Sequence, residues 1–194
     1  MRLIIVDGLD GVGKDTHAQL IKQYYEKKGN QVILRSHPEA DNKFGRKTKK
    51  ALLGTGKINR IIASIFFAFD VIRSLRNYYD IQSDDTLIMV RYLMATAYLP
   101  KGLAQLAYRV FHRFVPTSEY MFFLDASTDE LLDRLQKRPE QEMFETREEL
   151  LRVRKKAIDL AKGWYIIDTS QSIEKTSSQI VDVLQLLDSE ADIQ

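Results

Sequence analysis

A glycine-rich loop near the amino end constrains this chain more than any other feature. Residues 8–16 read GLDGVGKDT, which fits the spacing G-x-x-x-x-G-K. The apolar run at 2–7 predicts a strand before the loop, and Ala18, Ile21 and Tyr25 predict one face of a helix after it. Glycines let backbone N–H groups surround phosphate oxygens, and the N-terminus of a helix favours negative charge. The loop therefore predicts a phosphate-binding site between a strand and a helix.

The rest of the chain alternates short apolar runs with helical patterns. Further strands are predicted at 31–35, 86–90, 119–124 and 164–167. Helices are predicted from 14 to 29, at 43–53, 57–79 and 101–114, from the capping sequence at 127–130 to Pro139, at 148–161 and after Ser172. Parallel strands need crossovers of a dozen or more residues, which these helices provide. We expect an α/β fold of three layers, with helices flanking a central five-stranded parallel sheet and ligands bound at the carboxyl ends of its strands.

Length and composition narrow the class of protein. The 194 residues suit one domain, and a hydrophobic share of 44% can form a sizeable core. A formal net charge of +2 argues against binding of nucleic acid by bulk charge. The absence of cysteine excludes disulfides, and the three histidines lack the spacing of a zinc site. The most apolar stretch, 61–69, is about half the roughly 18 residues of a membrane span, so we expect a soluble, cytoplasmic protein.

The long apolar helix at 57–79 has two interpretations. Ile58, Ile62, Ile65 and Phe69 recur at intervals of three and four residues, and further apolar residues widen this stripe beyond one face. Such a helix is either buried completely within one chain or covered by a second copy of the chain.

The nucleotide phosphates are expected to meet the loop and the start of its helix, at Gly8, Asp10, Gly11, Val12, Gly13, Lys14, Asp15 and Thr16. Lys14 adds a full positive charge that reaches the β- and γ-phosphates of ATP. Asp15 departs from the usual pattern, in which a Ser or Thr hydroxyl binds Mg²⁺. Asp15 and Thr16 are the candidate metal residues, with Asp15 acting through water, or with Asp10 or Asp125 positioning the ion instead. The alternative role of Asp15 is that of a favourable acid in the first turn of a helix.

Five segments together resemble the thymidylate kinase family. They are GLDGVGKDT at 8–16, SHPEADNKFGRKTKKALL at 36–53, IFFAFD at 65–70, VRY at 90–92 and WYIIDTSQSIE at 164–174. The resemblance runs over nearly the whole chain. It implies a phosphate-binding loop, an acceptor pocket, a lid and an adenine loop in this order, in an ATP- and Mg²⁺-dependent kinase of nucleoside monophosphates.

The resemblance also implies roles for residues of the acceptor pocket. Asp10 is expected near the acceptor sugar, Arg91 between the acceptor phosphate and the transferring phosphate, and Phe67 against the base. An arginine at the carboxyl end of a strand can make this bridge in a fork geometry. His37 and Tyr98 complete the acceptor set, with His37 a candidate for stacking on the base. Core packing for Phe67 and an incidental place for His37 are the alternatives.

A basic lid is expected at about 134–145. Arg134 and Arg138 are the candidate catalytic residues there, in addition to Lys14 and Arg91, because a closing basic lid excludes water and neutralises charge on the transferring group. A solvated charged helix face is the alternative for these arginines. Gln171 matches the family's adenine loop.

The resemblance fails mainly in the acceptor pocket. Val90 stands where the family has an aspartate before the strand-end arginine, and Val71 stands where it has the arginine that addresses a pyrimidine ring. The segment 36–40 lacks a phosphate-contacting arginine, and Met143 replaces an arginine of the lid. ATP binding is therefore better supported than any named acceptor.

The function expected from these features is phosphoryl transfer from ATP to a nucleoside monophosphate, with dTMP, converted to dTDP, as the first candidate. Two alternatives stay open: a nucleotide-binding interaction module that has lost the kinase activity, and a kinase of another small acceptor. The expected partners are the two nucleotides and a second copy of the chain in a homodimer, with no nucleic acid and no membrane.

Overall fold

Five parallel strands form the centre of the molecule in the computed structural model, which describes residues 1–54, 56–100, 102–137 and 146–191. The strands are β1 (Arg2–Gly8), β2 (Val32–Ser36), β3 (Thr86–Val90), β4 (Met121–Asp125) and β5 (Tyr165–Asp168). Their order in the sheet is β2-β3-β1-β4-β5, and each neighbouring pair is parallel. The predicted α/β fold with a central parallel sheet is confirmed.

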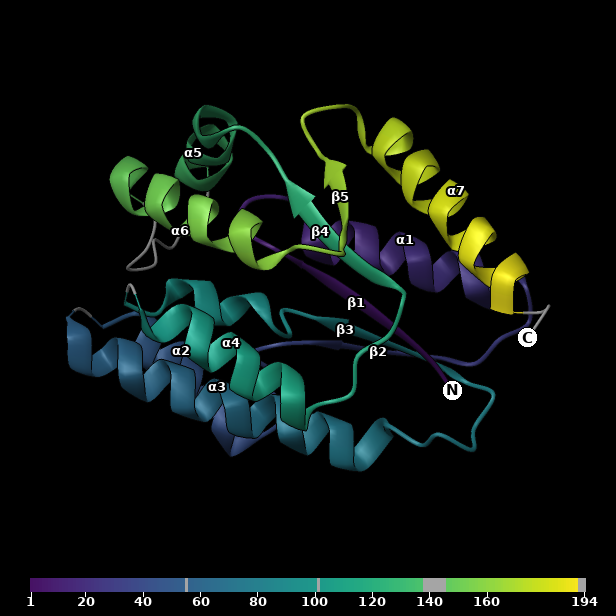
Figure 1. Cartoon of the computed structure of the whole chain (residues 1–194), viewed down its shortest axis with the longest axis horizontal. Coiled ribbons are helices and arrows are strands. Elements are labelled where there is room, and N and C mark those ends of the chain that lie inside the picture. Colours follow the sequence, from purple (N-terminus) through teal and green to yellow (C-terminus); the bar gives the residue numbers. More distant parts are fainter. Residues whose placement is uncertain (55, 101, 138–145, 192–194) are drawn as a thin grey trace.

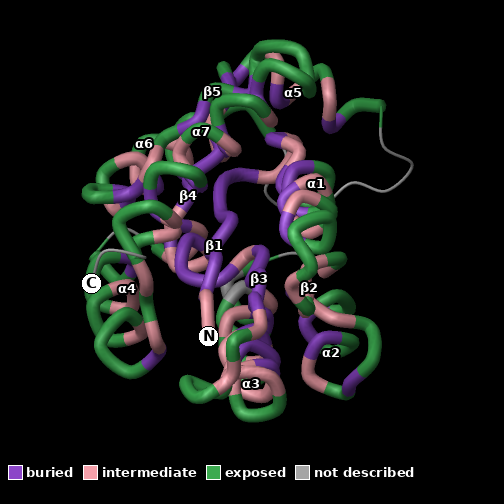
Figure 2. Tube along the Cα trace, turned by 90° about the vertical axis from the view of Figure 1, so that its right-hand side faces the viewer, coloured by how far each residue is buried: buried purple, intermediate pink, exposed green. Residues whose placement is uncertain are grey.

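Helices cover both faces of this sheet. They are α1 (Lys14–Lys27), α2 (Lys43–Leu52), α3 (Lys57–Tyr78), α4 (Leu103–Phe114), α5 (Thr128–Gln136), α6 (Arg147–Leu160) and α7 (Ile173–Ala191), with a 3₁₀ helix, η1, at Met94–Tyr98. In Figure 2, α1 lies on one side of the strands, and α4 and α6 lie on the other. The helices α2 and α3 pack against each other below the sheet in Figure 1. None of these described helices is long and apolar enough to cross a membrane.

Strand β1 lies at the centre of the sheet, and its position places the glycine loop at the centre of the carboxyl edge. Ile4, Ile5 and Val6 are fully buried, because helices cover both faces of the strand. In the register of the sheet, Val6 lies opposite Val90 of β3, and Gly8 lies opposite Leu124 of β4. The residues that follow β1 and β3 therefore meet at one place.

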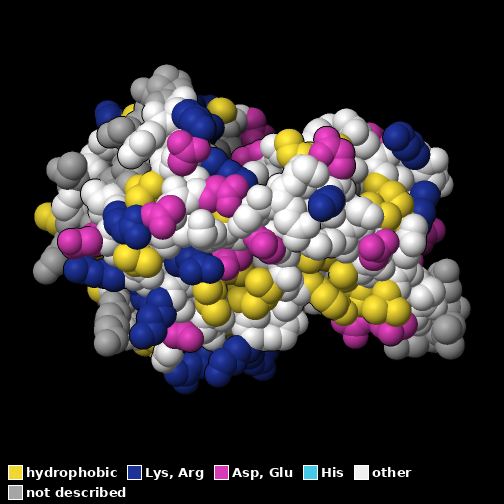
Figure 3. Space-filling model, turned by 90° about the horizontal axis from the view of Figure 1, so that it is seen from above, with side chains coloured by type: hydrophobic (Ala, Val, Ile, Leu, Met, Phe, Trp, Pro, Cys, Tyr) yellow, Lys and Arg dark blue, Asp and Glu magenta, His cyan; other side chains and the backbone are white. Residues whose placement is uncertain are grey.

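The surface mixes charges of both signs. In Figure 3, basic and acidic side chains lie interspersed on the face seen from above, with apolar side chains in small groups between them. This pattern agrees with the near balance of 29 basic and 27 acidic residues.

Helix α3 corrects one expectation. Ile58, Ile61, Ile65 and Phe69 are exposed by 75%, 51%, 50% and 48%, so complete burial of the apolar stripe within one chain is wrong. The face that α3 turns to the molecule contains smaller and partly polar residues, Ala63, Phe67, Asp70, Val71 and Ser74. The other interpretation of this stripe, a surface covered by a second copy of the chain, stays a prediction.

Candidate active site

Glycine geometry shapes the loop between β1 and α1. A Cβ atom at Gly8 would lie 2.3 Å from the carbonyl oxygen of Leu124, so no other residue fits against β4 there. Gly13 precedes α1 with φ at 81°, a left-handed conformation that a glycine adopts without strain. The loop thereby delivers the free N–H groups of the first turn of α1 to the carboxyl edge of the sheet.

Lys14 is buried beneath this loop. Its Nζ atom donates to the carbonyl oxygens of Gly8 at 3.0 Å and Leu9 at 2.5 Å, and it lies 3.4 Å from Oδ1 of Asp10. Burial lowers the pKa of Lys14 to about 8, although the carboxylate of Asp10 opposes this shift. A buried ammonium held only by carbonyl oxygens and a distant carboxylate is a strong binding group for an anion, because phosphate oxygens offer it full negative charge.

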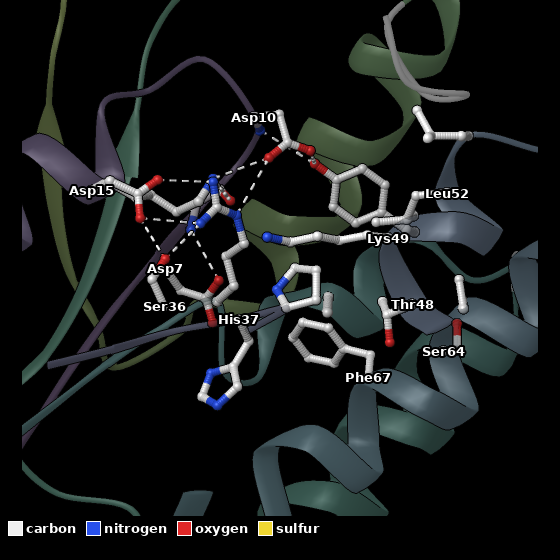
Figure 4. A pocket seen from close by; sticks show the side chains of 18 residues that line it. Asp7, Asp10, Asp15, Ser36, His37, Thr48, Lys49, Leu52, Ser64 and Phe67 are labelled. Carbon is white, nitrogen blue, oxygen red and sulfur yellow. Dashed lines mark hydrogen bonds and ion pairs between the residues drawn. The ribbon is translucent and has the colours of Figure 1, made fainter. Parts of the chain in front are cut away.

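Arg91 follows β3 and faces the loop. Its backbone is left-handed, with φ at 56°. Its Nη1 and Nη2 atoms donate to the two carboxylate oxygens of Asp15 at 3.3 and 3.0 Å, and Nη1 also donates to Oγ of Ser36 at 3.0 Å. Nε lies 3.7 Å from Oδ1 of Asp10. The guanidinium group therefore contacts both Asp15 and Asp10, which are labelled in Figure 4, and Arg91 lines the cavity.

Asp7 holds the backbone of the same turn, and sequence reasoning did not identify it. Its Oδ2 atom accepts hydrogen bonds from the backbone N–H groups of Tyr92, Leu93 and Met94 at 2.8, 2.8 and 2.9 Å. Only Met94 is the first residue of η1, and the other two N–H groups lie just before it, so a carboxylate of β1 holds the start of a helix about 85 residues away in sequence. Burial raises the pKa of Asp7, and the three N–H groups oppose the shift. The available signal was an acidic residue at the end of a buried apolar strand.

A cavity of about 570 Å³ opens beside these groups. One wall consists of Asp10, Lys14, Asp15 and Arg91. The other wall consists of residues from α2 and α3, namely Thr48, Lys49, Leu52, Leu53, Ala63, Ser64 and Phe67. Figure 4 shows Lys49 extending from α2 across the cavity and Phe67 facing it from α3. The cavity thus lies between a charged wall and a largely apolar one.

Asp10 and Tyr98 join the loop to η1 at the mouth of this cavity. The Tyr98 hydroxyl donates to Oδ2 of Asp10 at 2.9 Å, and the Asp10 backbone N–H donates to the same hydroxyl at 3.3 Å. Both residues line the cavity, as their predicted place in the acceptor set requires.

His37 has a different place from the other members of the predicted acceptor set. The residue is completely buried, with Nδ1 3.2 Å from the carbonyl oxygen of Val90 and Nε2 2.9 Å from Oγ of Ser74. The ring meets Phe67 edge to face, with the ring centres 6.1 Å apart, and His37 lines the cavity, although Figure 4 shows its ring turned away from Asp10 and Lys49. Burial lowers the pKa of His37 to about 4. The geometry therefore gives His37 a supporting position behind Phe67.

Lys49 is a cavity residue that sequence reasoning missed. It lies on the exposed side of α2, and within the described parts of the chain its ammonium group has no hydrogen bond or ion pair. In Figure 4 the ammonium points across the cavity, away from α2. The only signal in the sequence was a basic run, which is usually a solvated helix face.

Arg134 is the one lid candidate that the structure places beside the loop. Its guanidinium donates to the carbonyl oxygens of Gly11 at 3.2 Å and Thr169 at 2.7 Å, and to Glu130 at 2.5 Å. Gln171 is exposed, two residues after Thr169. Arg138 and the rest of the predicted lid, 138–145, lie outside the described residues. On α6, Arg154 pairs with Asp125 through two hydrogen bonds of 2.8 and 2.7 Å, outside the cavity.

The oxygen atoms near the loop fit a metal ion that a nucleotide carries. In the described part of the chain, no group of three or more His, Cys, Asp and Glu residues could hold an ion by itself. Thr16 presents an exposed hydroxyl in the first turn of α1. Both oxygens of Asp15 already accept hydrogen bonds from Arg91, and Oδ1 also accepts one from Ser36. A site with one hydroxyl and a nearby carboxylate suits Mg²⁺, which keeps several waters and takes other ligands from phosphates.

Comparisons with known proteins agree with this architecture. The family model for thymidylate kinase matches residues 6–180. The chain belongs to the thymidylate kinase family. Among curated relatives, a probable thymidylate kinase of Thermococcus kodakarensis is 26% identical, over 95% of this chain and 97% of the relative. One from Thermococcus gammatolerans is 28% identical, over 94% and 95%. The solved thymidylate kinase from Candida albicans superposes with a TM-score of 0.78 at 16% identity, over 96% of this chain and 92% of that one.

Two departures from the thymidylate kinase family pattern have a structural explanation here. Val90 is fully buried at the end of β3, and Arg91 pairs with the carboxylate of Asp15 of α1. Val71 is also fully buried, and because valine carries no charge, this position supplies no cation to the cavity. The only cationic side chain on the α2 and α3 wall of this cavity, among the residues described, is Lys49.

Proposed function

We propose that this protein transfers the γ-phosphoryl group of ATP to a nucleoside monophosphate, with dTMP as the acceptor and dTDP and ADP as products. The observation that carries the proposal is the cavity itself, because Lys14 of the glycine loop and Arg91 of the next strand line the same 570 Å³ space. A protein that only bound ATP would have no need of an arginine fork beside an open cavity. Membership of the family supports the choice of dTMP.

The donor phosphates are assigned to the backbone N–H groups of 8–16 and to Lys14. The phosphates replace the carbonyl oxygens of Gly8 and Leu9 around the buried ammonium, and the N-terminus of α1 adds its partial positive charge. Arg134 and Gln171 flank the adenine end, since Arg134 already reaches Gly11. Arg138 stays a predicted lid residue. This half of the site positions the leaving ADP.

Thr16 is the residue assigned to the metal, and Asp15, the other candidate from the sequence, is assigned to Arg91. When bound, Mg²⁺ neutralises charge on the β- and γ-phosphates. Direct coordination by Asp15 is disfavoured because Arg91 and Ser36 already occupy its oxygens. The chain's own contribution to catalysis is positioning and electrostatic stabilisation, without a covalent intermediate.

The acceptor lies between the two walls of the cavity. Arg91 faces both the acceptor phosphate and the transferring group, Asp10 and Tyr98 meet the sugar, and Phe67 packs on the base. Attack by an acceptor phosphate oxygen on the γ-phosphorus of ATP forms one P–O bond and breaks the bond to ADP. Arg91 stabilises the negative charge shared between the two phosphates during this step.

A homodimer in the cytoplasm completes the proposal, with the whole chain as one domain and a lid at about 134–145. The exposed face of α3, formed by Ile58, Ile61, Ile62, Ile65 and Phe69, is the surface proposed to meet a second copy. Light scattering at micromolar concentration should give twice the 22.5 kDa mass of one chain. A monomeric mass would remove the dimer and leave the catalytic proposal intact.

The catalytic proposal is tested with purified protein, ATP, Mg²⁺ and a panel of nucleoside monophosphates. ADP formation should depend on the acceptor and should be fastest with dTMP. The panel is necessary because the α2 and α3 wall of this cavity carries few polar groups. The thymidylate kinase from Candida albicans is itself described as having broad substrate specificity. ATP binding without turnover on any monophosphate would contradict the kinase assignment.

A further inference from the structure

Asp15 faces an arginine, although it occupies the position where a metal-binding hydroxyl is expected. Both of its carboxylate oxygens accept from the guanidinium of Arg91, in a fork arrangement. Ser36, at the end of β2, links the pair from the side: its hydroxyl donates to Asp15 and accepts from Arg91 at 3.0 Å. Three elements, α1, β2 and β3, thus supply one hydrogen-bonded cluster.

The backbone of Arg91 gives a second, independent observation. Its φ of 56° is left-handed, which is uncommon for a residue other than glycine and persists only where surrounding contacts enforce it. Asp7 enforces it on the carboxyl side by binding the N–H groups of the next three residues, and the Arg91 N–H donates to the carbonyl oxygen of Val6 at 3.2 Å. The chain therefore fixes the backbone of Arg91 with one carboxylate and its guanidinium with another.

We propose that Asp15 and Ser36 are positioning residues that hold the Arg91 guanidinium ready for the acceptor phosphate. The inference rests on the proposed function and deepens it. The adjacent residue of β3, Val90, is apolar and fully buried, so the strand itself offers no anion to orient the arginine. Asp15 can make the contact because the first turn of α1 and the residue that follows β3 line the same cavity.

Positioning matters because Arg91 has a long side chain with several rotatable bonds. An arginine that is already ordered loses less conformational entropy when a phosphate binds. The N–H groups that Asp15 and Ser36 do not occupy also keep a defined direction. The Asp15 side chain is 59% exposed, so the ion pair alone contributes little stability. Its effect should therefore appear in acceptor binding and transfer far more than in protein stability.

The first experiment measures whether Asp15 holds Arg91, and it needs no turnover. Phenylglyoxal modification of arginines is followed by mass spectrometry in the wild type, Asp15→Asn, Asp15→Glu and a control, Glu26→Gln, which removes an exposed carboxylate paired with Lys22 on the same helix. Arg91 should react about tenfold faster in Asp15→Asn, which loses a charge-assisted pair. Asp15→Glu and the control should stay near the wild type, and exposed Arg152 serves as the internal reference.

The second experiment separates an arginine-positioning role from a metal-binding role. In Asp15→Asn the KM for the acceptor should rise about tenfold or more, and Ser36→Ala should show a smaller change in the same direction. The Mg²⁺ concentration for half-maximal rate and the KM for ATP should change less than twofold, on the order of experimental scatter. Asp15→Glu, which keeps the carboxylate, should recover most of the acceptor affinity.

Two results would overturn the inference. One is equal reactivity of Arg91 in the wild type and Asp15→Asn. The other is an Asp15→Asn variant that needs much more Mg²⁺ while its acceptor KM is unchanged, which would make Asp15 a metal ligand. If the wild type phosphorylates no monophosphate, the proposed function fails separately, and the reactivity of Arg91 still decides whether Asp15 holds it.

Discussion

The two walls of the cavity are built in opposite ways. On the wall of β1, α1 and β3, Lys14, Asp15 and Arg91 each have a defined hydrogen-bond partner. On the wall of α2 and α3, the cavity meets mostly apolar side chains such as Leu52, Leu53 and Phe67, and Lys49 is held by no partner among the described residues. The difference indicates that phosphate handling depends on a preorganised network, whereas recognition of the acceptor depends on shape and a few adaptable contacts.

The largest expected effect lies on the charged wall. Lys14→Ala should lower the rate of phosphoryl transfer by at least about a thousandfold, because it removes the only buried cation of the loop. Initial rates and ATP binding by calorimetry measure the change. Lys22→Ala, which changes a partly exposed lysine of the same helix outside the cavity lining, is the matched control and should keep wild-type rates. If Lys14→Ala kept a tenth of the wild-type rate, phosphate transfer would not depend on the preorganised network of the charged wall.

The apolar wall is tested at Phe67. Phe67→Ala should raise the KM for the acceptor about tenfold to a hundredfold, since stacking of a base on an aromatic ring contributes roughly 1–3 kcal/mol. The KM for ATP should stay within about twofold, because Phe67 lines only the acceptor side. Phe66→Ala, on the same helix but outside the cavity lining, is the control. Equal losses for ATP and the acceptor would show that Phe67 acts through the core alone, and thermal unfolding would register the same defect.

The sequence predicted the fold well, because local patterns carried it. The strand at 86–90 and the capping of α5 by Ser127 were exact, and the other boundaries moved by at most two residues, except that α5 ends at Gln136 and not at Pro139. Which face of α3 is buried was left open, because periodicity measures hydrophobicity and does not show which side a neighbouring helix covers. The 3₁₀ helix at Met94–Tyr98 was missed, since its cap comes from Asp7 on a different strand.

In the candidate site, too, the sequence predicted local features and missed contacts between distant segments. The loop residues 8–16 were found because their spacing is a local property of the sequence. The Asp15–Arg91 pair, the Asp7 cap and the place of Lys49 depend on segments that are far apart along the chain. His37 was selected as a residue for the base, yet the fold turns its ring toward Ser74. Residues that come together from distant segments have no fixed spacing in the sequence, so no local motif predicts their contacts.

A smaller effect is expected at Lys49. Lys49→Ala should weaken binding of the acceptor monophosphate about tenfold, the scale of one charge-assisted contact, and leave binding of the corresponding nucleoside unchanged. Calorimetric titration with both ligands measures the ratio. The neighbouring Lys50→Ala is the control, because Lys50 lies outside the cavity lining. Equal weakening of nucleotide and nucleoside would place Lys49 in the support of the wall, away from the phosphate.

The smallest expected effect is the uptake of a fraction of a proton by Lys14 when ATP binds. The pKa of Lys14 is lowered by burial to about 8, and phosphates around it should raise this pKa again. ATP binding between pH 8 and 9 should therefore take up a fraction of a proton, and the affinity for ATP should fall as the pH rises above about 8. Calorimetry in buffers of different ionisation enthalpy measures the uptake. Lys14→Ala should abolish it, and an unchanged uptake in that variant would assign the proton to another group.

The central claim is that the two walls bring ATP and a nucleoside monophosphate together for direct transfer. ATP labelled in its γ-phosphate, incubated with the enzyme, Mg²⁺ and dTMP, tests this most directly when the products are separated. The account predicts that the label appears in dTDP, in equal amount to the ADP formed, and that Lys14→Ala transfers none. Label released only as inorganic phosphate, or label that stays in ATP with every monophosphate offered, would contradict it.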